Sequence, residues 1–200
     1  MWIVEGRVEL RPEGDPESTS RYHFHGTRFA GQHGLRIAQF RTYGFTFSGL
    51  APHTEWDVFP EAMRLWASYV DVAKPAYASR VALRYINAID FHTQGDLARL
   101  FTVPPQLPAD APAQKLFGFL VRTTSYDEQT KVFVHSTQAS ERVTSDESRT
   151  IVLDIDVYRE ADYKIPSDLT SMQTSFQCLR EIKNATFFAS ITEETARRYE

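Results

Sequence analysis

Two stretches with helical spacing of apolar residues interrupt a chain that is otherwise rich in strand-forming runs, and this pattern constrains the fold most. Between Val58 and Ala73 apolar side chains recur every three or four residues, which predicts an amphipathic helix that ends before Pro75. The same spacing over 169–182 predicts a second long helix. The sequence therefore predicts an α+β fold, with a mainly antiparallel sheet and two long helices packed against it.

Runs of β-branched and aromatic residues mark the expected strands. The glycine-punctuated stretch 22–47 predicts an antiparallel meander. Residues 80–91 are apolar on both alternating faces, which predicts a central strand covered on both sides. Further strands are expected over 116–124, 131–137 and 150–158.

The length of 200 residues suits one large domain or two small ones, and we expect a single α+β domain over 1–200. Residues 104–112 hold four of the ten prolines and predict a loop. This loop divides the chain into possible pseudo-halves, 20–103 and 113–200. No residue-level repeat supports a duplication.

Composition narrows the class of protein. With 42% hydrophobic residues the chain can bury a sizeable core. No apolar run approaches the ~20 residues of a membrane span, and the N-terminus lacks the pattern of a secretory signal. The lone cysteine, Cys178, excludes an intrachain disulfide. We therefore expect a cytoplasmic protein without membrane contact, and we predict no cofactor.

The stretch between Glu17 and Glu55 contains no acidic residue and is the one distinctly cationic segment. Its arginines include Arg36 and Arg41, which we take as candidate contacts for an anion. Aromatic residues alternate with these arginines, a mixture that single-stranded nucleic-acid binders also use. Because aromatic side chains in strands more often form core, nucleic acid is the weaker alternative.

Asp154 and Asp156 stand two apart in an alternating strand, so both carboxylates point to one face about 7 Å apart. Such a pair is a candidate metal site, although oxygen-ligand metals need more ligands than it supplies. His23 and His25 share a strand face in the same way and form a second candidate metal pair, with His33 or His53 as a third ligand.

Arg84 lies on one face of the strand 80–91, and Tyr85 and Asn87 lie on the other. We expect Arg84 and Asn87 to be more buried than ordinary polar residues, so both need partners. A structural ion pair between Arg84 and Asp154 or Asp156 would satisfy this need. The alternative is that Arg84, Tyr85, Asn87 and Arg122 contribute to a binding site for an anion.

Three segments carry a resemblance to a known family: 80–87 (RVALRYIN), 153–157 (LDIDV) and 179–184 (LREIKN). Together with 45–50 and 187–192, they resemble a sporadically distributed bacterial protein family of unknown function. The resemblance covers about residues 40 to 195 and implies that this chain is abbreviated at its N-terminus. It brings no catalytic residues, and it implies an accessory or defence-linked role.

No dinucleotide-binding, Walker, nucleophile-elbow or C-x-x-C motif occurs in the sequence. We therefore expect a non-enzymatic binding protein that recognises a partner protein or a small anionic ligand. The alternative is a metal-assisted hydrolase acting on a phosphate ester, with Asp154 and Asp156 as metal ligands and Arg84 or Arg122 stabilising charge.

Overall fold

The computed structural model describes residues 2–9, 17–51, 56, 58–91, 97–112, 116–140 and 149–198. For 2–9 and 17–24 it describes the backbone alone. The chain divides into two compact units, residues 1–75 and 76–200. The single-domain expectation stays a prediction.

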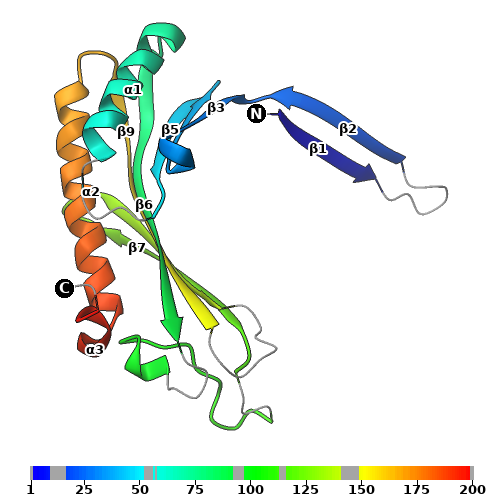
Figure 1. Ribbon diagram of the computed structural model, residues 1–200, viewed down its shortest axis with the longest axis vertical. Coiled ribbons are helices and arrows are strands. Elements are labelled where there is room, and N and C mark those ends of the chain that lie inside the picture. Colours follow the sequence, from blue (N-terminus) through cyan, green and yellow to red (C-terminus); the bar gives the residue numbers. More distant parts are fainter. Residues whose placement is uncertain are drawn as a thin grey trace. The chain divides into compact units, whose positions relative to one another are not determined.

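The described elements are β-strands, three α-helices and two short 3-10 helices (Figure 1). The first unit contains β1 (Trp2–Glu9), β2 (Glu17–Phe24), β3 (Gly26–Gly31), η1 (Gln32–Gly34), β4 (Arg36–Arg41), β5 (Gly44–Gly49) and α1 (Val58–Ala73). The second contains β6 (Tyr77–Phe91), η2 (Leu97–Arg99), β7 (Phe119–Asp127), β8 (Val132–Ser140), β9 (Arg149–Lys164), α2 (Leu169–Ser190) and α3 (Glu193–Ala196).

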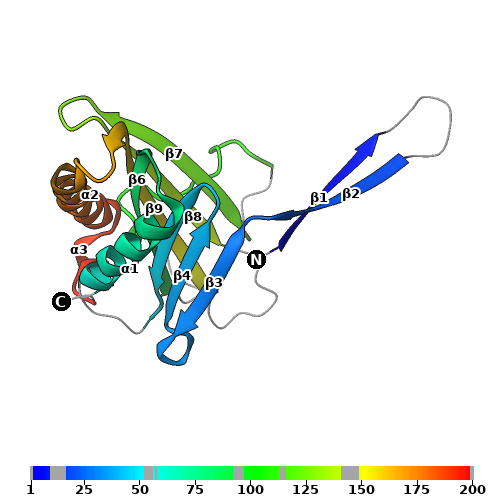
Figure 2. The same cartoon turned by 90° about the horizontal axis from the view of Figure 1, so that it is seen from above.

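The first unit is built from an antiparallel hairpin, β1–β2, and an antiparallel meander, β3–β4–β5, with α1 packed on β5 (Figure 2). An antiparallel meander is present, as predicted, but it begins at β3, because residues 22–24 of the predicted stretch belong to β2 and pair with β1. The turn between β3 and β4 places His33 and Gly34 at positive φ, 58° and 87°. These two residues form the turn that reverses the chain between β3 and β4.

Helix α1 has the predicted bounds, and its apolar stripe explains why it packs where it does. Tyr69, on this stripe, is buried and donates a hydrogen bond from its hydroxyl to the Arg41 carbonyl at 3.1 Å. Its ring lies 6.0 Å from Phe45 and 5.4 Å from Trp66 between ring centroids. The contact with Phe45 joins α1 to β5. The sequence offers Thr54 or Asp57 as a residue that could cap the start of this helix, and both lie outside the described residues.

The second unit contains a four-stranded antiparallel sheet in the order β6-β9-β8-β7. The prediction that residues 80–91 form a central strand is wrong, because β6 lies at an edge and β9 occupies the interior. The side of β6 that we expected to be covered carries Ile86, which is 63% exposed, and Ala88, which is exposed. The prediction failed because apolar residues of β6 lie on an exposed face, so an apolar pattern on both faces did not indicate a covered strand.

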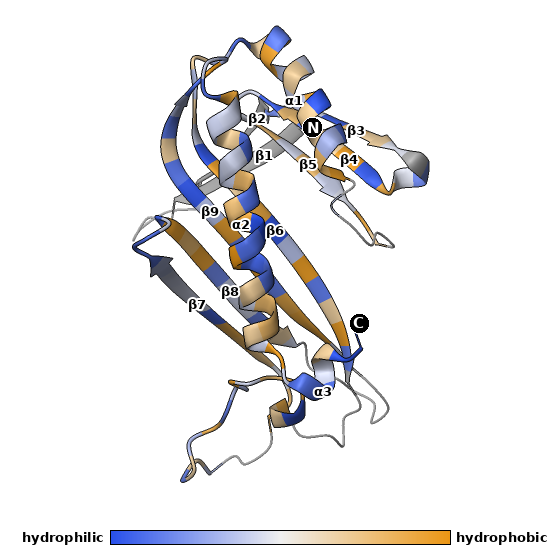
Figure 3. Ribbon diagram, turned by 90° about the vertical axis from the view of Figure 1, so that its left-hand side faces the viewer, coloured by the Kyte–Doolittle hydropathy of each residue, from blue (hydrophilic) through white to orange (hydrophobic). Residues whose placement is uncertain are grey.

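Helix α2 covers one face of this sheet, where it packs on β9 and β6 (Figures 1 and 3). Alternate residues of β9 point into this contact and have no exposed surface: Ile151, Leu153, Ile155 and Val157. From the helix, Met172, Leu179 and Phe187 are buried. Burial of these side chains stabilises the layer by about 1.5 to 3 kcal/mol each.

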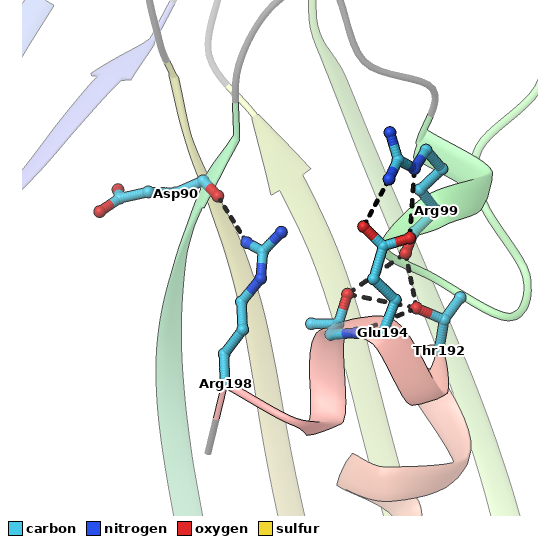
Figure 4. Close-up of polar contacts among 6 residues, drawn as sticks. Asp90, Arg99, Thr192, Glu194 and Arg198 are labelled. Carbon is cyan, nitrogen blue, oxygen red and sulfur yellow. Dashed lines mark hydrogen bonds and ion pairs between the residues drawn. The ribbon is translucent and has the colours of Figure 1, made fainter. Parts of the chain in front are cut away.

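Helix α2 begins at the predicted residue but continues past the predicted end at 182 to Ser190, so the apolar run 186–189 forms its last turn. The residues after α2, including α3, then contact η2 (Figure 4). Thr192 caps α3 by accepting a hydrogen bond from the Thr195 amide at 3.3 Å, and its hydroxyl donates to the Arg99 carbonyl at 2.5 Å. Arg99 also pairs with Glu194 at 2.7 Å.

The α+β fold is confirmed: two antiparallel sheets each carry one long helix. Each helix packs on the sheet of its own unit. The proline-rich segment 104–112 contains no helix or strand, as predicted. Among the helices that the structure describes, none is long and apolar enough to cross a membrane.

Candidate functional site

The alternation of β9 gives the second sheet two chemically different faces. Residues 151, 153, 155 and 157 of β9 are buried on the helix side, whereas residues 152, 154, 156 and 158 between them are half-buried on the other. The pairing of the strands then sets rows of side chains across the second side. One row contains Arg84, Asp156, His135 and Thr124, and the next contains Ile86, Asp154, Thr137 and Arg122. We call this side the charged face.

Arg84 and Asp154 form a bidentate ion pair on the charged face. The Arg84 Nε donates to Asp154 Oδ1 at 2.9 Å and its Nη2 donates to Oδ2 at 2.5 Å. This hydrogen bonding holds the pKa of Arg84 above its usual value. The predicted pairing of Arg84 with one of the two aspartates is confirmed. Arg84 is nevertheless 58% exposed, so the expectation that it is buried is wrong.

Asp156 is held by a different arginine, Arg80. The Arg80 Nη2 donates to Asp156 Oδ2 at 3.1 Å. The same guanidinium lies over the ring of Tyr158, 4.2 Å from the ring centroid. Tyr158 in turn stacks on Phe133 at 5.1 Å, and Phe133 lies 4.6 Å from Tyr126. An aromatic row across β9, β8 and β7 therefore borders the charged row.

His135 belongs to the row of Arg84 and Asp156 and contacts the aromatic row through Tyr158. Its Nδ1 is 2.9 Å from the Thr124 hydroxyl, and its ring centroid is 5.2 Å from that of Tyr158. These two contacts fix the orientation of the imidazole. Within the described part of the chain, Nε2 of His135 has no partner and is available to a ligand.

A shallow pocket of about 150 Å³ lies on the charged face. It is lined by residues from all four strands: Arg84, Arg122, His135, Thr137, Asp154 and Asp156. Arg84 and both aspartates have their ion-pair partners, but Arg122, which is exposed, has no ion-pair partner among the residues described. The pocket thus combines one uncommitted cation with a hydroxyl and an imidazole.

Tyr85 and Asn87 lie on the opposite side of β6 from Arg84 and do not join the pocket. The Asn87 amide donates to the Leu153 carbonyl at 3.0 Å. Tyr85 supports the ammonium group of Lys183 from α2, whose Nζ lies 3.8 Å from the ring centroid. Burial, together with the charge of Arg180, lowers the pKa of Lys183. These two predicted ligand contacts therefore help to hold α2 on the sheet.

Arg36 and Arg41 belong to the first unit, so the predicted set of ligand contacts falls on two units. Arg36 is mostly buried and faces Glu61 of α1 at 3.8 Å. Arg41 donates to the Gln39 side chain through Nε at 3.0 Å and also through Nη2. Both arginines have partners within the unit, which weakens the argument for anion or nucleic-acid contact there.

The structure describes both side chains of one candidate metal pair, Asp154 and Asp156, but not both of the other. Asp154 and Asp156 do point to one face, as predicted, but arginines hold oxygens of both carboxylates. Of the residues that the structure describes, no three His, Cys, Asp or Glu side chains form a group that could hold a metal ion. His23 lies in β2, outside the described side chains, and His25 is half-buried before β3.

The sequence did not single out His135, Thr137 or Arg80 for this site. His135 and Thr137 alternate on β8 and share the parity that places them on one face. The missing information was the strand order, since β8 must lie beside β9 before these residues face Asp154 and Asp156.

Comparison with protein-family models, with curated proteins and with solved structures found no match. The family resemblance seen in the sequence stays a prediction.

Proposed function

We propose that this chain is a binding protein that captures an anionic group on the charged face of its second sheet. The observation that carries the proposal is the pocket beside Arg122. Arg80 and Arg84 are each matched to an aspartate, whereas Arg122 has no such partner in the described residues. A guanidinium in this setting favours a carboxylate or phosphate, because its planar fork of donors matches those groups.

Two further hydrogen-bonding groups add to the cation. Thr137 and His135 line the same pocket, and both can hydrogen-bond an oxygen atom. The ion pair between Arg84 and Asp154 fixes the wall opposite Arg122 across the sheet. A pocket of about 150 Å³ fits a single anionic group better than an extended ligand. The anionic group belongs to a small ligand or to an acidic side chain of a partner protein.

The family resemblance extends the proposal to an accessory or defence-linked role in a bacterium. We place this role in the cytoplasm, where the lone Cys178 remains a free thiol. The hydrolase hypothesis requires more. Asp154 and Asp156 would have to exchange arginine contacts for a metal, and a third ligand would have to come from elsewhere.

The test is an NMR titration of the full chain with inorganic phosphate, with succinate and with a glutamate-rich peptide. We expect shifts at residues of the charged face, and R122M should weaken binding at least about tenfold, since a charge-assisted hydrogen bond contributes about 1.5 to 3 kcal/mol. The matched control is R28M, which removes an exposed arginine of the first unit and should leave binding unchanged.

The three probes separate the sources of the anionic group. Binding of phosphate or succinate indicates a small ligand, and binding of the peptide alone indicates an acidic partner. If R122M binds as tightly as the parent chain, the site is wrong. If no probe shifts the charged face, the proposed function is wrong.

A further inference from the structure

The two edges of the second sheet differ in their protection against pairing with another strand. At the β6 end of the sheet the pairing of β6 with β9 shifts by one residue between Ala78 and Arg80, with the extra residue on β9, and Arg80 and Arg84 of β6 add charges. Bulges and charged side chains are devices by which natural sheets block such edges. Strand β7 pairs with β8 without a register shift over 119–127, contains no proline, and has only Arg122 as a charge between its ends.

The side chains of β7 are exposed on both faces of the sheet. Every residue from Leu120 to Tyr126 is exposed, including Leu120 at 75%, Val121 at 42% and Tyr126 at 49%. Helix α2 packs on β9 and β6, which lie at the other end of the strand order from β7. Across the described ranges no strand pairs with the outer edge of β7. A regularly paired, partly apolar strand therefore presents unpaired backbone groups at this edge.

We propose that β7 pairs with β7 of a second copy of this chain, antiparallel, about a twofold axis at Thr123. A twofold axis perpendicular to the sheet keeps the two faces of both copies on the same sides, so only residues of equal parity can face one another. With the axis at Thr123, this residue faces itself. Leu120 then faces Tyr126 of the second copy, and Arg122 faces Thr124.

The register with the axis at Thr123 is self-complementary, whereas the registers with the axis one residue earlier or later are not. An apolar pair closes each end, and a threonine pair, a favourable cross-strand combination, lies at the centre. An axis at Arg122 would set two guanidinium groups directly opposite each other, which is destabilising. An axis at Thr124 would set Leu120 against Glu128 and Val121 against Asp127.

Pairing in this way joins the two four-stranded sheets into one continuous sheet. Arg122 keeps its place on the charged face, because the added strand lies beside β7 and not above it. The inference therefore does not depend on the anion-binding proposal, and each can fail without the other.

The experiment is sedimentation velocity on the full chain from micromolar to millimolar concentration, with three charge variants. The parent chain should approach twice its 22.9 kDa mass as concentration rises. T123K places two ammonium groups opposite each other and should raise the dissociation constant at least about tenfold, and T123E should do the same. A mixture of T123K and T123E should restore the dimer. A88K, which adds the same charge to the other edge of the sheet, should leave the dimer intact.

Thr123 is exposed, so these variants should fold, and far-UV circular dichroism checks that they do. A parent chain that stays at monomer mass up to millimolar concentration overturns the proposal. So does a dimer that survives both T123K and T123E, or one that A88K disrupts instead. Failure of the mixed variants to pair would exclude the register at Thr123.

Discussion

The ion pair between Arg84 and Asp154 gives the sharpest test of the charged face. Two close hydrogen bonds, at 2.9 and 2.5 Å, would suggest a strong contribution to stability. The two charges at about 4 Å would attract by about 4 kcal/mol at an effective dielectric constant of 20, but by only about 1 kcal/mol in water. Because the Arg84 side chain is 58% exposed, the value near water applies. We expect a coupling free energy of about 0.5 to 1 kcal/mol.

A double-mutant cycle with R84M and D154N measures this coupling. Urea unfolding followed by circular dichroism gives the free energy of unfolding of the parent, the two single variants and the double variant. The coupling should shrink in 1 M salt, where the Debye length falls to about 3 Å. A coupling above about 2 kcal/mol, unchanged by salt, would refute the reasoning and mark the pair as a buried structural contact.

Three further predictions concern the layers around the site. I155A should lower the free energy of unfolding by about 2 to 5 kcal/mol because Ile155 has no exposed surface, whereas I86A, at a position that is 63% exposed, should cost less than about 1 kcal/mol; urea unfolding compares them. G26A should be strongly destabilising by the same assay, since Gly26 has φ 138° and an added Cβ would lie 2.0 Å from the Phe40 carbonyl oxygen. Folding lowers the pKa of Lys183, so between the folded and unfolded pKa values the unfolded chain binds one more proton. The free energy of unfolding of the parent, relative to that of K183M, should therefore rise with pH up to the unfolded pKa near 10.5. A difference between the two free energies that stays constant across this alkaline range would contradict the burial of Lys183.

The sequence contained enough information for the elements that depend on local spacing. Helix α1 has the predicted bounds because its apolar stripe ends at Ala73 and Pro75 prevents continuation. The pairing of Arg84 with an aspartate of β9 followed from charges on alternating strands. These inferences needed only periodicity and the cost of an unpaired charge.

The rest required long-range information. The strand 80–91 carries apolar residues on both sides, and nothing local distinguishes an interior strand from an edge strand that exposes apolar residues such as Ile86 and Ala88. The pocket needed the order β6-β9-β8-β7, which brings Arg122 and His135 beside the aspartates. These contacts could not be predicted from the sequence, because the residues come from strands that are far apart in the chain.

Strand β9 serves two layers at once, because its odd-numbered residues from 151 to 157 build the core under α2 and its even-numbered residues build the charged face. Deleting or inserting one residue in β9 would turn Asp154 and Asp156 toward the helix and Leu153 and Ile155 toward solvent. A two-residue change would keep every side chain on its own face. Length variation in related chains should therefore be confined to pairs of residues in this strand, or to the turns at its ends.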